Sequence, residues 1–64
     1  MTQKELLYYE DAVMHEESIT KIINEAINNL EDEKLVTFMD NELDKHNSMK
    51  EKLINQMEDI INGW

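Results

Sequence analysis

Apolar side chains recur along the chain at alternating steps of three and four residues, in two long segments. In the first half the repeat runs through these positions: Tyr9, Ala12, Glu16, Ile19, Ile23, Ala26 and Leu30. In the second half it runs through these positions: Leu35, Met39, Glu42, His46, Met49, Leu53, Gln56 and Ile60. This spacing places each set on one face of an α-helix. The pattern predicts two helices, over about residues 3–29 and 32–62.

The ends of the two predicted helices carry recognisable signals. Thr2 followed three residues later by Glu5 is a capping box, so the first helix should begin near residue 3. The chain lacks proline and its only glycine is Gly63, so nothing interrupts the pattern before residues 28–32, NNLED. There, asparagine tolerates the left-handed conformation that often ends a helix, and Glu31 or Asp32 can cap the next one. We expect a single all-α domain, an antiparallel hairpin turning near residue 31 and ending at Gly63, with Trp64 as the last side chain.

A hairpin of 64 residues buries too little apolar surface to be comfortably stable alone, and the chain has no cysteine with which to form a disulfide. Its apolar stripe is also wider than one partner helix requires. The additional apolar positions flank the repeat on both sides: Leu6, Tyr8, Val13, Ile22, Ile27, Val36, Leu43 and Met57. This breadth is typical of four-helix packing. We therefore expect two hairpins to associate as a homodimeric four-helix bundle.

Charge and hydropathy narrow the classes of partner. The formal net charge is −9 and the six basic residues are scattered, so the chain should repel nucleic acid. It has no apolar run of about 20 residues and no apolar signal-peptide core at its start, which predicts a cytoplasmic protein with no membrane partner.

Three polar residues stand at positions of the apolar repeat and form a predicted polar belt. They are Glu16 in the first helix and Glu42 and His46 in the second. If the helices fold back near residue 31, Glu16 lies opposite His46, with Glu42 about one turn away. A buried carboxylate needs compensation, which a protonated His46, a proton or a bound cation could each supply.

The belt suggests either a divalent-metal site or a hydrogen-bonded layer that fixes the register of the helices. A dimer would present four glutamates and two histidines, the ligand inventory of di-iron and di-manganese carboxylate bundles. Those bundles use Glu-x-x-His, whereas here Glu42 precedes His46 by four residues and Leu43 occupies the expected position. The candidate ligands are Glu16, Glu42, His46 and, flanking the repeat, His15, for iron, manganese or zinc. His15 has an alternative partner in Asp11, one turn earlier.

Several short motifs occur along the chain in this order: KELLYYEDA at 4–12, His15-Glu16, the turn LEDE at 30–33, His46 and Gly63-Trp64. Together they resemble the small spore-coat proteins of the coat F type, found in spore-forming Firmicutes. The resemblance implies a ferritin-like helical bundle and a structural role in the spore coat of sporulating cells, beside other coat proteins. It implies no catalytic activity, so we expect a non-enzymatic protein. Some members have two helix pairs in one chain, and a dimer would restore the missing pair here.

A different class remains as the alternative. Small helical hairpins that dephosphorylate sporulation response regulators are similar in size and in the segment Glu42-Leu43-Asp44. Their motif has a serine four residues before the aspartate, where this chain has Asp40. The third alternative is an assembly module that binds no ligand.

Overall fold

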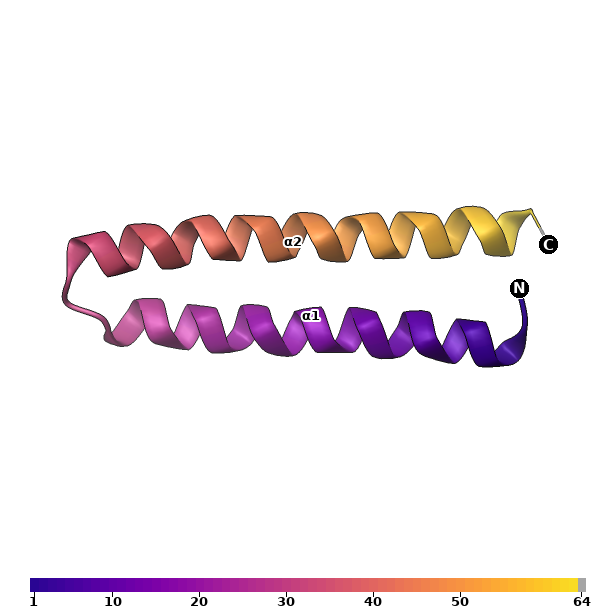
Figure 1. Ribbon diagram of the computed structural model, residues 1–64, viewed down its shortest axis with the longest axis horizontal. Coiled ribbons are helices and arrows are strands. Elements are labelled where there is room, and N and C mark those ends of the chain that lie inside the picture. Colours follow the sequence, from indigo (N-terminus) through magenta and orange to yellow (C-terminus); the bar gives the residue numbers. More distant parts are fainter. Residues whose placement is uncertain (64) are drawn as a thin grey trace.

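The structure is a computed structural model and describes residues 1–63. It consists of two α-helices, α1 (Gln3–Asn29) and α2 (Glu33–Asn62), joined by a turn at residues 30–32. The helices lie antiparallel and side by side, so that the start of α1 and the end of α2 are at the same end (Figure 1). The hairpin is a rod of 48 × 16 × 10 Å. The predicted all-α hairpin is confirmed.

Side-chain caps explain where the helices begin. The Glu5 amide donates to Thr2 Oγ1 at 3.1 Å, and the Thr2 amide donates to Glu5 Oε1 at 3.1 Å, which confirms the capping box. Asp32 caps α2, because its Oδ1 accepts from the amides of Lys34 at 2.8 Å and Leu35 at 3.2 Å. The helix α2 therefore starts at Glu33, one residue later than expected.

The turn differs from the expectation in its backbone conformation. No residue within 1–63 has a positive φ, so asparagine does not end α1 in the left-handed conformation. Instead Leu30 is extended, with φ −85° and ψ 138°, and its amide donates to the Ala26 carbonyl. The Asn29 side chain also donates to the Glu25 carbonyl at 2.7 Å, one turn earlier in the helix.

The face that α1 turns towards α2 agrees with the predicted repeat. Every position of that repeat is buried or half-buried, and Glu16 and Ile23 are the most enclosed, at 7% and 8% exposure. The half-buried stripe is wide and also includes the following residues: Leu6, Val13, Thr20 and Ile27.

For α2 the predicted repeat is wrong at three of its eight positions. Leu35, Met49 and Gln56 are exposed. The positions that face α1 are instead these: Val36, Met39, Leu43, His46, Lys50, Leu53, Met57 and Ile60. They also alternate steps of three and four, displaced by one residue at every second position. Glu42 is half-buried beside Leu43, with its side chain 28% exposed, so it borders both the interface and solvent.

The interface between the helices is thin. Ile23 is the most buried apolar residue, and large apolar side chains remain exposed along the rod. These are Leu7, Tyr8, Met14, Ile22, Leu35, Phe38, Met49 and Ile61.

Candidate functional site

Glu16 and His46 meet at the middle of the hairpin, one from each helix. His46 Nδ1 lies 2.5 Å from Glu16 Oε2, within hydrogen-bonding distance. The Glu16 side chain is 9% exposed and that of His46 22%. The sequence predicted that these residues would lie opposite each other, and the structure agrees.

Glu42 lies on the other side of the imidazole. Its Oε2 is 4.0 Å from His46 Nε2, and its Oε1 accepts from Lys45 Nζ at 3.2 Å. The Glu42 side chain is 28% exposed, so it borders solvent while Glu16 does not. His46 thus lies between two carboxylates, each facing a different ring nitrogen.

This arrangement accounts for the burial of Glu16. Burying an isolated carboxylate costs free energy, because the group loses its hydrogen bonds to water. A hydrogen bond from a histidine replaces part of that loss. If Nδ1 carries the proton and donates it to Glu16, the lone pair of neutral His46 is on Nε2, facing Glu42. If both nitrogens are protonated, the imidazolium faces a carboxylate on each side.

A neighbouring ion pair links the helices and was not expected from the sequence. Lys50 Nζ lies 3.1 Å from Glu17 Oε1, and Lys50 occupies an inward position of α2. Its aliphatic stem covers the interface while its ammonium group reaches the edge of α1, as lysine side chains commonly do. The signal was present in the sequence, because Lys50 continues the spacing through Val36, Leu43 and Met57.

The fourth predicted ligand does not join the others. His15 is exposed, although it directly precedes Glu16 in the chain. No ion pair joins it to Asp11 in the part of the chain that the structure describes. The site therefore consists of Glu16, Glu42 and His46.

Within one hairpin these residues fit a metal ion poorly. Across residues 1–63, no three histidine, aspartate or glutamate side chains are grouped as a metal would require. Glu16 already holds Nδ1, which leaves His46 Nε2 and Glu42 as the available ligands. Structural metal ions commonly take four protein ligands, so a complete site needs a second set of residues.

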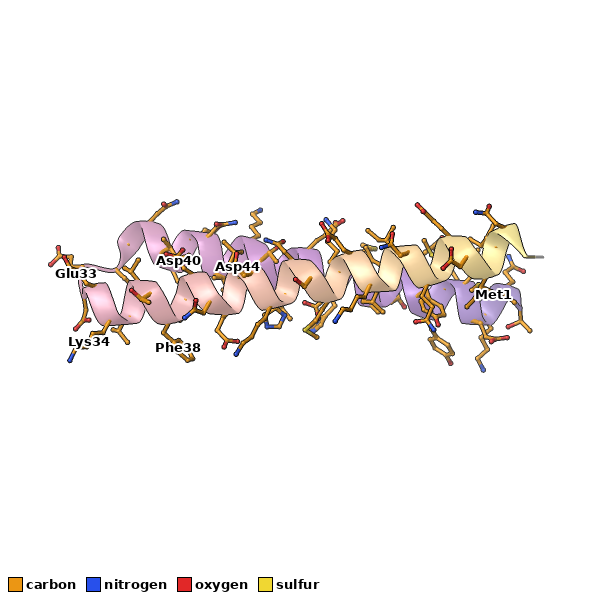
Figure 2. The ribbon with its side chains drawn as sticks, turned by 90° about the horizontal axis from the view of Figure 1, so that it is seen from above. Met1, Glu33, Lys34, Phe38, Asp40 and Asp44 are labelled. Atoms are coloured by element: carbon orange, nitrogen blue, oxygen red, sulfur yellow. The ribbon has the colours of Figure 1, made fainter. Side chains whose placement is uncertain are left out.

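Asp40 and Asp44, the residues relevant to the phosphatase alternative, are both exposed on α2. Figure 2 shows them on one side of the rod and Phe38 on the other. An open depression on the surface of α2 is lined by Asp44, Lys45, Ser48, Met49 and Lys52. Because this depression is open to solvent, Asp44 does not lie in an enclosed catalytic pocket.

Comparison with known proteins gives no further guidance: no family model, curated protein or solved structure matches the chain. Neither helix, over the residues described, is long and apolar enough to cross a membrane.

Proposed function

We propose that this chain is a structural, non-enzymatic protein that works as a self-associated four-helix bundle. The observation that carries the proposal is its surface area. The hairpin exposes 5098 Å², whereas a folded monomer of 7.6 kDa typically exposes about 4,300 Å². The excess of about 800 Å² equals what each partner buries in a protein interface of standard size.

The experiment is a measurement of mass and melting temperature over a range of protein concentrations. We expect a dimeric mass by light scattering at micromolar concentration, and a melting temperature that rises with concentration because association contributes to stability. A cooperative melt of a monomer that does not change with concentration would contradict the proposal.

The place of this assembly is proposed to be the spore coat, with other coat proteins as neighbours. The support is the set of motifs at 4–12, His15-Glu16, 30–33 and His46. A further motif, Gly63-Trp64, includes residue 64, which lies outside the described residues. Mass spectrometry of coat fractions from sporulating cells tests the proposal: the chain should be enriched there over the spore core and the mother-cell cytoplasm.

For the phosphatase alternative the support is weaker, since Asp40 stands where a serine is expected and Asp44 is exposed without a pocket around it. Incubation with a phosphorylated receiver domain separates the two functions. We expect no increase in the rate of phosphate release. An increase that Asp44→Ala abolishes would favour the regulatory function over the structural one.

A further inference from the structure

The side chains of the rod outside the helix interface divide into two unlike faces. A residue that directly precedes an inward position lies about 100° round the helix to one side, and a residue that directly follows lies to the other. Antiparallel helices are related by a local twofold axis perpendicular to the plane containing both. Residues that precede inward positions therefore share one face of the hairpin, whichever helix they belong to.

One of these faces carries more of the large exposed apolar side chains than the other. We define the apolar face by these residues, each of which directly precedes an inward position: Tyr8, Ile22, Leu35, Phe38 and Met49. All are large exposed side chains, with Ile22 64%, Tyr8 61% and Phe38 57% exposed. Charged residues separate them on the same face, and these are Glu5, Asp11, Glu25, Glu42, Lys45, Lys52 and Asp59. Phe38 projects from the lower edge of the rod in Figure 2, while Asp40 and Asp44 lie on the upper side.

The opposite face carries much of the negative charge. Acidic residues directly follow inward positions along both helices: Glu10, Glu17, Asp40, Asp44, Glu51 and Glu58. Three exposed apolar residues also lie on this face, and these are Leu7, Met14 and Ile61. Two copies brought together through this face would place like charges against each other at a considerable cost.

We propose that the apolar face is the surface on which a second copy of this chain docks, face to face. This inference rests on the self-association proposed above and adds which side of the hairpin is covered. The excess surface of about 800 Å² matches one partner's share of a standard interface. The apolar face is selected because it carries five of the large exposed apolar side chains, against three on the acidic face, and because Lys45 and Lys52 offset part of its negative charge.

Docking on this face also changes the setting of the polar site. Glu42 directly precedes Leu43, so it lies on the apolar face beside His46 and its partner Lys45. The second copy brings its own Glu42 and His46 to the same interface.

A matched pair of substitutions tests the choice of face. Ile22 and Met14 are both on α1 and equally exposed, at 64% and 63%, but lie on the apolar and acidic faces respectively. By sedimentation equilibrium, Ile22→Glu should raise the dimer dissociation constant at least about a hundredfold, because it buries a carboxylate without a partner. Met14→Glu should change it by less than about threefold.

The outcomes separate this inference from the proposed function. If Met14→Glu weakens the dimer as much as Ile22→Glu, the choice of face is wrong while self-association stands. If the wild-type chain remains monomeric at millimolar concentration, both fail, and the apolar face serves a different partner.

A second measurement tests the choice of face even if the Ile22→Glu variant does not fold. The chain has no cysteine, so Ile22→Cys and Met14→Cys each introduce a single thiol. At high protein concentration iodoacetamide should alkylate the thiol at position 22 about tenfold more slowly than the one at position 14. Dilution below the dissociation constant should remove the difference. Equal rates at every concentration would overturn the inference.

Discussion

His46 connects the two helices through one ring nitrogen and reaches the rim of the hairpin through the other. Glu16 holds Nδ1 at 2.5 Å, which orients the ring and leaves Nε2 directed towards Glu42, 4.0 Å away. A carboxylate that holds the far nitrogen of a histidine is the usual support for a metal-binding imidazole. The same contacts also describe a polar layer that fixes register, so the two interpretations differ in what they predict for added metal.

The metal hypothesis predicts a shift in stability that depends on Glu42. If the site binds iron, manganese or zinc, free metal at one hundred times its dissociation constant should stabilise the protein by about 2.7 kcal/mol. Glu42→Leu should abolish this gain. Thermal melts of both proteins, each with a chelator and with each metal, provide the measurement.

A polar layer without metal gives the opposite pattern. Melts should not respond to any of the three ions. Glu42→Leu should then be neutral or stabilising, because it replaces a partly buried carboxylate with an apolar group while Glu16 still pairs with His46. A metal-dependent shift that survives Glu42→Leu would show that other residues are the ligands.

At the level of the helices, the start and the inward face of α1 could be predicted, its final turn could not, and α2 could be predicted only in part. Thr2 and Glu5 form an unambiguous cap, and the inward positions of α1 are apolar apart from Glu16 and Thr20. In α2 two repeats one residue apart compete. Leu35 and Met49 are apolar and favour the repeat first predicted from the sequence. In the structure Val36 and Lys50 face α1 instead.

Two things made the second repeat hard to recognise. Lys50 interrupts its apolar character, and only the contact with Glu17 across the interface explains a lysine there. Leu35 and Met49 of the apolar face follow the same spacing, and they therefore favoured the other repeat. The pairing of Glu16 with His46 was predictable because position 46 belongs to both repeats, while the exposure of His15 depended on the side of α1 that α2 covers.

The phase of α2 can be checked with two adjacent residues. Met57 is inward and half-buried, whereas Gln56 is exposed. Met57→Ala should lower the free energy of unfolding by at least about 1 kcal/mol through lost packing, and Gln56→Ala by no more than about 0.5 kcal/mol. Urea denaturation of the two variants gives the comparison. A larger loss at position 56 would restore the repeat first expected from the sequence.

The cap of α1 predicts a local response to acid. The hydrogen bond from the Thr2 backbone, then the one with its side chain, lowers the pKa of Glu5 below its ordinary value of 4.5. The contribution of the cap is therefore complete above pH 4.5 and is lost as pH falls through the lower pKa of the folded state. Amide exchange at the start of α1 should accelerate in that range. Glu5→Gln should remove this pH dependence, because glutamine has no proton to gain there.

At the scale of the whole molecule, two opposing effects act on association. The apolar face favours it, and the net charge of −9 opposes it. Two such chains repel at long range, and salt screens this repulsion with a Debye length that falls from about 30 Å at 0.01 M to about 10 Å at 0.1 M. The dimer dissociation constant should therefore decrease as sodium chloride is raised over that range. Analytical ultracentrifugation measures it, and tighter association at low salt would indicate an interface held by ion pairs.

If two hairpins dimerise as proposed, the adjacent ends of the rod allow a gene fusion to measure their relative direction. Because α1 begins where α2 finishes (Figure 1), two copies encoded in tandem can be joined by a few residues if both turns point the same way. If the copies point in opposite directions, the connection must run along the 48 Å rod, which takes about 14 extended residues. The shortest linker that yields a compact single-chain bundle would thus report the relative direction of the two protomers.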